Sequence, residues 1–241
     1  MAASLNNPSA SAKTVLVTGG STGIGAEVIK TFLARTEAHV YTLSRTAIKV
    51  EESFGKFANR VTCVQLDLAK PLPPNLEILP PDRPLDILIH NAGSLSPAPF
   101  AQTTRAQWEH TFAVNVFGIV ELTQRLLPNL GFAERPHIVT IGSMGGYQGA
   151  SKFAGLSAYS ASKGALATLS QCLAVELAAQ QIRVNCLCLG ATNTEMLRKA
   201  FPGYTAPVSA AQMGEFIVDF ALHAATVMNG QIIPVTGGDP G

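Results

Sequence analysis

Short apolar runs alternate along the chain with longer stretches in which apolar residues recur every three or four positions. The short runs are typical of strands buried on both faces of a parallel sheet, and the longer stretches predict amphipathic helices. Strands that alternate with helices in this way predict an α/β fold of the doubly wound Rossmann type. The expected strands are 15–17, 39–43, 61–66, 85–89, 136–141, 182–187 and 231–235, and the expected helices are 26–34, 104–127, 157–179 and 209–225.

Three segments depart from this pattern. Residues 1–12 are polar and read as a disordered lead. Residues 70–84 contain six prolines, so we expect a short turn or an abbreviated helix there rather than a long crossover helix. Residues 195–209 lack a clear pattern and suit a mobile loop over a site. We therefore expect a single domain over 13–241, with a substrate loop at about 191–208.

The first expected strand runs directly into a glycine-rich turn, which the helix 26–34 follows. In this context Gly19 permits the tight turn, Gly23 lets the backbone approach a pyrophosphate, and Gly25 lets the helix pack closely. The helix N-terminus supplies free N–H groups for that phosphate. The spacing G-x-x-x-G-x-G differs from the common fingerprint, and without the flanking elements a simple glycine-rich turn is an equal reading.

The ends of the next two strands bear on the choice of dinucleotide. An NAD site usually carries an acidic residue at the end of the second strand, where this chain has Ser44 and Arg45. Arg45 suits a 2′-phosphate and favours NADP, although it also suits a solvent-facing loop. Asp67 either accepts a bond from an adenine amino group or caps the next segment, and Leu68 packs near the ring.

Tyr159 and Lys163 stand four apart in the helix 157–179, for which Ser157 is the expected N-cap. They share one helix face, where a cation would lower the pKa of the phenol and let it exchange protons. Taken alone, the pair also reads as two surface residues. Ser143 follows the fifth strand and faces the ligand crevice, and Asn115 sits inside a helix, which is tolerable at a local kink or beside a water.

Composition narrows the classes of function. Apolar residues make up 47% of the chain and charged residues 14%, with a net charge of +1 and no charged block. Nothing therefore favours a nucleic acid or a membrane surface as partner. No apolar run has the length of a membrane span or a signal peptide, so we expect a cytoplasmic protein. Four cysteines, with no ligand cluster around them, read as reduced structural thiols, and no metal site is expected.

In joint order and spacing, these pieces resemble the short-chain dehydrogenase/reductase family over nearly the whole chain. The matching pieces are Thr18–Gly25, Asp67-Leu68, Asn91-Ala92-Gly93, Asn115-Val116, Ser143, Tyr159-Ser160-Ala161-Ser162-Lys163, Asn185, Gly190, Thr194 and Gly237-Gly238. The resemblance implies a seven-stranded parallel sheet with three helices on each face, and dimers or tetramers.

The resemblance also implies a role for each residue of the site. Tyr159 would be the general acid and base, Ser143 would polarise the substrate oxygen, and Lys163 would bind the nicotinamide ribose and depress the Tyr159 pKa. Asn115 would hold a water that links Lys163 to solvent. The implied cofactor contacts are Gly19, Ser21, Gly23, Ile24, Gly25, Ser44, Arg45, Asp67, Leu68, Asn91, Ala92, Gly93, Arg125, Tyr159, Lys163, Thr192 and Thr194. For Arg125, an ordinary position on a helix surface is an equal reading.

Three departures from the family pattern matter. Leu189 stands before Gly190 where relatives often have proline, and Thr22 stands where many NADP-dependent relatives have a cation. Ser143 and Tyr159 are 16 positions apart, a few more than is usual, which enlarges the loop beside the substrate. We expect an NADP(H)-dependent oxidoreductase acting on a small to medium, hydrophobic ketone, aldehyde or alcohol. The alternative is a non-catalytic protein on the same fold that senses NADP(H) or works through partners.

Overall fold

A seven-stranded parallel sheet forms the centre of the computed structural model, which describes residues 12–237. This confirms the expected doubly wound fold and its seven strands, whose ends shift by a few residues. The disordered lead predicted for residues 1–12 lies, apart from Ala12, outside the described part of the chain. The strands, in spatial order, are β3 (Val61–Gln65), β2 (His39–Ser44), β1 (Thr14–Thr18), β4 (Ile87–His90), β5 (His137–Ser143), β6 (Arg183–Leu189) and β9 (Ile232–Val235).

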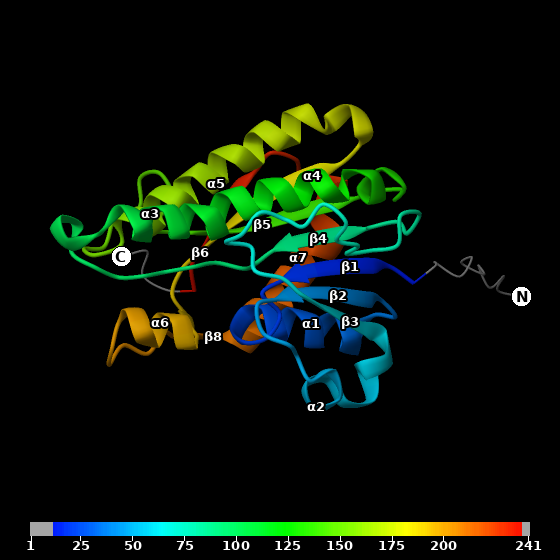
Figure 1. The fold of residues 1–241 in the computed structure, drawn as a ribbon, viewed down its shortest axis with the longest axis horizontal. Coiled ribbons are helices and arrows are strands. Elements are labelled where there is room, and N and C mark those ends of the chain that lie inside the picture. Colours follow the sequence, from blue (N-terminus) through cyan, green and yellow to red (C-terminus); the bar gives the residue numbers. More distant parts are fainter. Residues whose placement is uncertain (1–11, 238–241) are drawn as a thin grey trace, which may run out of the picture.

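Helices cover both faces of the sheet (Figure 1). Because successive side chains of a strand point to opposite faces, Val15 and Val17 join one apolar cluster and Leu16 the other. Burial on both faces is the reason that the strands read as continuous apolar runs. One face packs against α1 (Gly23–Arg35), α2 (Val50–Phe54) and α7 (Ala210–His223), and the other lies under α3 (Arg105–Phe112), α4 (Gly118–Gly131) and α5 (Ser157–Glu176).

The helix expected over 104–127 is interrupted in its middle. It begins as α3, passes through a π-helical segment at Ala113–Phe117, and continues as α4 to Gly131. Asn115 lies inside the π-helical segment and is fully buried. A π-helical turn is wider than an α-helical one and is often found at functional sites. The regular α-helix is therefore interrupted at the asparagine by a π-helical segment.

The proline-rich segment 70–84 crosses from β3 to β4 without forming a helix. Three polar side chains, one turn apart on α4, hold it by its backbone. Arg125 donates to the carbonyls of Pro73, Pro74 and Leu76, Glu121 accepts from the amide of Leu72, and Asn129 donates to the carbonyls of Pro80 and Arg83. These bonds replace the internal hydrogen bonds that a crossover helix would supply.

Two helix boundaries and one loop differ from the expectation. Helix α5 ends at Glu176, and Leu156 rather than Ser157 occupies its N-cap position without a side-chain cap. The segment 195–209 is not wholly irregular, because it opens with α6 (Glu195–Ala200). A two-stranded ribbon of β7 (Thr192–Asn193) and β8 (Val208–Ser209) joins the ends of that loop. Periodicity does not reveal α6, because six residues make fewer than two turns.

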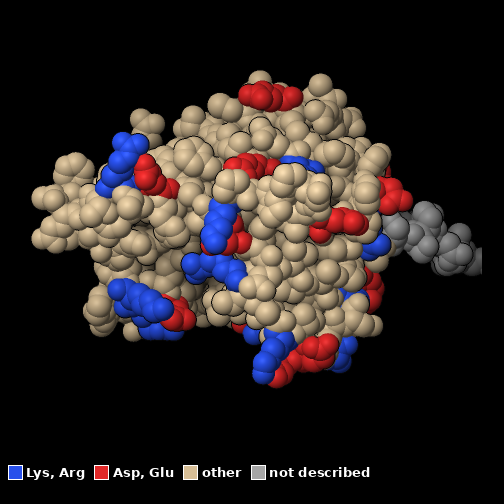
Figure 2. Space-filling model, viewed as in Figure 1, with Lys and Arg blue, Asp and Glu red and all other residues tan. Residues whose placement is uncertain are grey.

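Charged side chains of both signs are interspersed over the face shown in Figure 2. Within residues 12–237, no helix has both the length and the apolar character that crossing a membrane requires. The four cysteines are free thiols, of which Cys186 and Cys188 are buried in β6 and Cys172 is exposed.

Two histidines are buried as neutral side chains. His137 donates from Nδ1 to the carbonyl of Ala221 at 3.0 Å, and its Nε2 accepts from Asn185 at 3.0 Å. Burial lowers the pKa of His137 to about 4. Burial, and then the nearby charge of Lys163, lowers the pKa of His90 on β4 to about 3. Each histidine therefore binds a proton in the unfolded chain at a pH where it stays neutral in the fold.

These two histidines predict acid lability. Their folded pKa values lie below the unfolded value of about 6.5, so their contribution to stability is complete above that pH and is lost as the pH falls toward 4. Between pH 6 and 5 the free energy of unfolding should fall by up to about 2.7 kcal/mol per pH unit. Urea unfolding at a series of pH values measures this slope. His137→Gln should remove about half of the slope that these two histidines contribute.

Candidate functional site

The glycine-rich turn after β1 is shaped by contacts that only glycine permits. Gly19 and Gly23 have φ of +72° and +59°, in the left-handed region. A Cβ on Gly25 would stand 2.2 Å from the carbonyl oxygen of Gly19 and 2.5 Å from Nδ2 of Asn91. Helix α1 therefore begins pressed against the turn, and Thr22 at its N-cap makes no side-chain cap bond. The first-turn N–H groups are left to face an anion.

The segment after β4 is bonded to the same turn. Asn91 donates to the carbonyls of Thr18 and Gly19 at 3.0 and 3.3 Å, and the amide of Ala92 donates to Oγ1 of Thr18 at 2.9 Å. A Cβ on Gly93 would stand 3.6 Å from both Oδ1 of Asn115 and Nζ of Lys163. Asn91, Ala92 and Gly93 thus connect the turn to the neighbourhood of Lys163.

The buried amide of Asn115 joins three chain segments. Its Oδ1 accepts from the amide of Ser94 at 2.7 Å, and its Nδ2 donates to the carbonyl of Ser94 at 3.0 Å and to Oγ of Ser162 at 2.9 Å. Ser162 in turn donates to the carbonyl of Tyr159 at 2.7 Å. The π-helical segment is thereby fixed to α5 beside Lys163.

Ser143 and Tyr159 are hydrogen-bonded to each other at the carboxyl edge of the sheet. Burial raises the pKa of Tyr159, and the bond from Ser143 opposes that rise. The expected depression by Lys163 is not what the structure shows, because the desolvation of the phenolate outweighs the lowering contributions. Ser143 also accepts from the amide of Gly145 at 3.1 Å, which orients its hydroxyl at the end of β5.

Lys163 is nearly inaccessible, with 3% of its surface exposed. Its ammonium donates to the carbonyl of Ile141 on β5 at 2.6 Å and stands 5.9 Å from the centre of the Tyr159 ring. Burial lowers the pKa of Lys163 to about 8, while Cys186 and Cys188 on β6 act in the opposite direction. The tyrosine and lysine are therefore part of a polar centre inside the protein and are not two surface residues of the helix.

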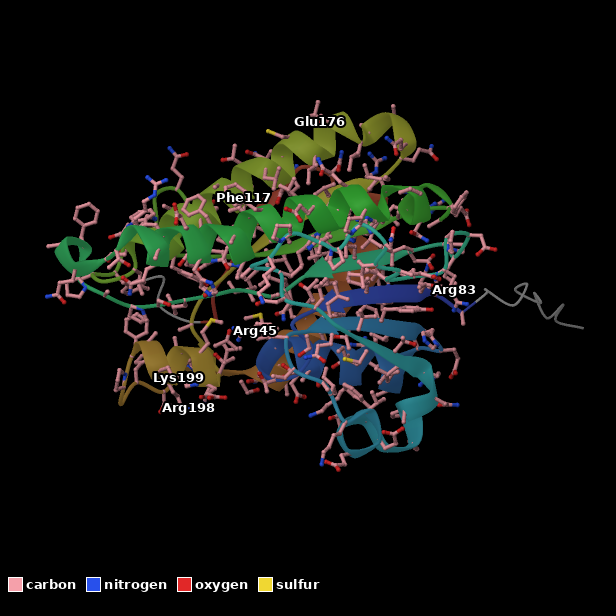
Figure 3. All side chains as sticks on the ribbon, in the orientation of Figure 1. Arg45, Arg83, Phe117, Glu176, Arg198 and Lys199 are labelled. Carbon is pink, nitrogen blue, oxygen red and sulfur yellow. The ribbon has the colours of Figure 1, made fainter. Side chains whose placement is uncertain are left out.

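The ends of β2 and β3 carry the residues assigned to the adenosine half of a dinucleotide. Ser44 is buried, and Arg45 follows it with an exposed side chain near the middle of Figure 3. Asp67 accepts from the amide of Ala69 at 3.0 Å, so it caps the following segment. Leu68 is buried. It lies against Gly118, the first residue of α4, where an added Cβ would contact it. At the first turn, Ser21 is exposed and Ile24 packs against the core.

The loop after β6 reaches the glycine-rich turn. Thr194 caps α6 by accepting from the amide of Leu197 at 3.2 Å, and its methyl group would lie 3.7 Å from a Cβ on Gly23. Thr192 is buried in the ribbon that closes this loop. Arg125 is not brought to the site: it stands ten residues beyond Asn115, or about 15 Å along the helix, and binds the proline-rich segment.

The loop between Ser143 and Tyr159 is tied down at three places. The amide of Ala98 donates to the carbonyl of Gly155 at 3.0 Å. Lys152 donates to the carbonyls of Tyr147 and Ala150. The ring of Phe153 meets the ring of Phe201, which follows α6, edge to face at 5.8 Å. The loop between Ser143 and Tyr159 therefore contacts the segment that follows α6.

Two residues of this centre were named from the sequence only as parts of motifs and were given no role. Ser162 completes the bonds of Asn115, and Thr18 binds Ala92 through its hydroxyl. The signal for Ser162 was available, since a buried asparagine amide needs partners and Ser162 adjoins Lys163. Within the described part of the chain, no cluster of three or more His, Cys, Asp or Glu is placed to hold a metal ion.

These features define a class of protein: a doubly wound domain with a dinucleotide-type turn beside a Ser–Tyr–Lys centre. The short chain dehydrogenase family model matches residues 13–205. The chain is 31% identical to 2-dehydro-3-deoxy-D-gluconate 5-dehydrogenase of Bacillus subtilis, over 94% of each chain. It is also 31% identical to a rhamnolipid-biosynthesis 3-oxoacyl-[acyl-carrier-protein] reductase of Pseudomonas aeruginosa, over 92% of this chain and 94% of that protein.

A solved structure extends the likeness to three dimensions. A putative short chain dehydrogenase of Escherichia coli CFT073, complexed with NADPH, has a TM-score of 0.78 and 28% identity over 92% of this chain and 95% of the other. The chain belongs to the short-chain dehydrogenase/reductase family of oxidoreductases.

The contact at Gly25 predicts a large effect of a small substitution. Gly25→Ala would place a methyl group 2.2 Å from a backbone oxygen, so α1 and the turn must separate. We expect a loss of about 1–3 kcal/mol in the free energy of unfolding, measured by urea denaturation. Gly131→Ala is the matched control, because nothing lies within 4 Å of its Cβ position. Equal stability of the two variants would contradict this description of the turn.

Proposed function

We propose that this protein is an NADP(H)-dependent oxidoreductase that interconverts a small to medium, hydrophobic ketone or aldehyde and its alcohol. The observation that carries the proposal is the hydrogen bond between Ser143 and Tyr159, beside the buried ammonium of Lys163. That centre adjoins a turn at which Gly25 leaves no room for a side chain and α1 has no side-chain cap. These residues fit a dinucleotide whose phosphates lie at the turn and whose ribose lies near Gly93 and Lys163.

When bound, the reduced nicotinamide supplies the hydride for the substrate carbon. The protein supplies the proton and the geometry. Ser143 donates to the carbonyl oxygen of the substrate and holds it beside the phenol of Tyr159. Tyr159 transfers its proton to that oxygen as negative charge develops there, and it takes the proton back in the reverse reaction.

The residues behind Tyr159 stabilise the phenolate that proton transfer leaves. Lys163 holds a positive charge 5.9 Å from the phenol ring, and the bond from Ser143 lowers the Tyr159 pKa. Asn115 uses its amide on Ser94 and Ser162, so its contribution is to fix the segment along which a water would reach Lys163. The proton that Tyr159 gives up is then replaced by way of Lys163 and this water, behind α5.

The preference for NADP rests on Ser44 and Arg45. Ser44 brings no carboxylate to the end of β2, and the exposed guanidinium of Arg45 is free to bind a 2′-phosphate through a charge-assisted pair. The NADPH complex of the Escherichia coli CFT073 relative supports this choice.

The hydrophobic character of the substrate is inferred from the two flanking loops. Phe153 and Phe201 of these loops meet edge to face, and Met196 on α6 is 42% exposed. Apolar side chains that remain accessible beside a polar centre favour a ligand with an apolar body and one polar group. Self-association remains an expectation from the family resemblance, and a cytoplasmic location remains an expectation from the sequence.

Tyr159→Phe tests the proposed chemistry. Without the phenolic hydroxyl no proton reaches the substrate oxygen, so NADPH-linked turnover of a carbonyl panel should fall by at least about a hundredfold. The dissociation constant of NADPH, measured by fluorescence titration, should change little. Tyr41→Phe is the matched control, because Tyr41 packs in the core under the sheet. If the parent protein binds NADPH tightly but turns over no carbonyl or alcohol, the non-catalytic alternative holds instead.

Arg45→Ala tests the cofactor. Loss of a charge-assisted contact should weaken NADPH binding about ten- to a hundredfold and leave NADH binding unchanged. Arg83→Ala is a suitable control, because Arg83 binds Thr14 at the amino end of β1 and lies toward the opposite end of the sheet (Figure 3). A parent protein that binds NADH more tightly than NADPH would overturn the choice of NADP.

A further inference from the structure

His90 is a buried histidine whose tautomer follows from its partners. Its Nε2 lies 2.9 Å from Oγ1 of Thr123 on α4. The hydroxyl of Thr123 donates to the carbonyl of Ile119 at 2.8 Å, so it accepts from His90. Nε2 therefore carries the proton, and Nδ1 presents a lone pair. Nδ1 is fully enclosed and has no hydrogen-bond partner among the described residues.

An unpartnered acceptor in this position is costly. A buried polar atom without a partner destabilises a fold by about 1–3 kcal/mol, so native proteins normally supply a donor or an ordered water. His90 has no surface exposed, so the partner must come from the groups packed around it. Oγ1 of Thr123 is already committed, as shown above.

Lys163 is the charged group near His90: His90 pairs with Thr140 on β5, and the ammonium of Lys163 donates to the carbonyl of the next residue, Ile141. The charge of Lys163 also acts on His90 through space. An ammonium has three N–H donors, and one of them serves the carbonyl of Ile141. The other titratable groups around Lys163 are Tyr159, one turn earlier on α5, and Cys186 and Cys188 on β6. A spare donor and an unpartnered acceptor therefore occupy the same buried centre.

We propose that His90 is a positioning residue of the proton relay. Its Nδ1 accepts a hydrogen bond from one buried water molecule, which in turn accepts from the ammonium of Lys163. This bond holds Lys163 in the charged form and in the rotamer that serves Tyr159. The role rests on the proposed function, in which Lys163 acts behind Tyr159. It goes beyond that function by placing a group on β4 in the relay.

Two substitutions separate this role from a purely structural one. His90→Asn places a carbonyl oxygen where Nδ1 stands and gives up the bond to Thr123. His90→Gln reaches Thr123 with an N–H and leaves no acceptor at the Nδ1 position. The first variant thus retains the proposed interaction, and the second retains the bond that the structure already accounts for.

The readout is the alkaline limb of the pH profile of kcat for carbonyl reduction with NADPH. Charged Lys163 is required, so the rate falls as the pH rises through the pKa of this group. His90→Gln should move the limb to lower pH by roughly one unit, the equivalent of one lost bond to a charged group. His90→Asn should leave the limb at the parent's position, whatever its rate. A shift in neither variant, an equal shift in both, or a shift in His90→Asn alone overturns the proposal.

A second measurement does not depend on turnover. In the protein labelled with ¹⁵N-histidine, the His90 signals are those of the five histidines that disappear in His90→Gln. Replacing Lys163 by Met removes the donor, so the Nδ1 resonance of His90 should move toward that of a free lone pair. An unmoved resonance overturns the proposal. A parent protein that reduces no carbonyl refutes the proposed function alone, and the spectrum still decides whether Lys163 is bonded to His90 through the water molecule.

Discussion

The ammonium of Lys163 lies under the carboxyl edge of the sheet with 3% of the residue exposed, and its surroundings follow from that burial. A cation removed from water must be hydrogen-bonded to be tolerated. The carbonyl of Ile141, 2.6 Å away at the end of β5, meets part of this requirement. Space around the lysine is also restricted: a Cβ on Gly93 would stand 3.6 Å from the ammonium, and a Cβ on Gly146 would stand 2.7 Å from the Cβ of Lys163. Glycine at both positions lets the segments that follow β4 and β5 pack against this residue.

The break in the helix 104–127 has its explanation in the same centre. A regular helix would use the amide and carbonyl groups around Asn115 only for its own ladder. The π-helical segment widens the turn there, and the side chain of Asn115 enters a three-way contact with Ser94 and Ser162. Ser162 adjoins Lys163 in sequence. The bond from Asn115 to Ser162 therefore fixes the position of the lysine on α5 relative to the π-helical segment that leads into α4.

The sequence predicted the frame of this protein better than its fine structure. The alternation of short apolar runs with helical periods predicted the sheet, because a strand that is buried on both faces is apolar along its whole length. The tie between Asn91 and the glycine-rich turn, and the Ser143–Tyr159 bond, agree with residues named from the family pattern. The direction of the Tyr159 pKa did not follow from the Tyr-x-x-x-Lys spacing. It depends on the desolvation of the whole centre, which four residues of sequence do not encode.

The prediction that Arg125 contacts the cofactor has a different difficulty. A cation on a helix surface has no periodic signature of its partner, and here the partner is a set of backbone carbonyls in a proline-rich segment without internal bonds. The prolines correctly predicted that this segment forms no long helix. Without a helix its backbone carbonyls need other donors, and Arg125 and Asn129 supply them. Local rules thus identified the unsatisfied backbone but not the residue that satisfies it.

The two ends of the site differ in how they are held, and this bears on how reaction and substrate are related. Tyr159, Lys163 and Asn115 lie on helices that pack across the sheet, and each is fixed by bonds to backbone or to buried side chains. The proposed substrate side is made of two loops that meet through Phe153 and Phe201. Loops tolerate insertion, whereas packed helices do not. On the proposed function, lengthening the loop between Ser143 and Tyr159 changes which substrates the protein can admit and leaves the proposed proton-transferring groups in place.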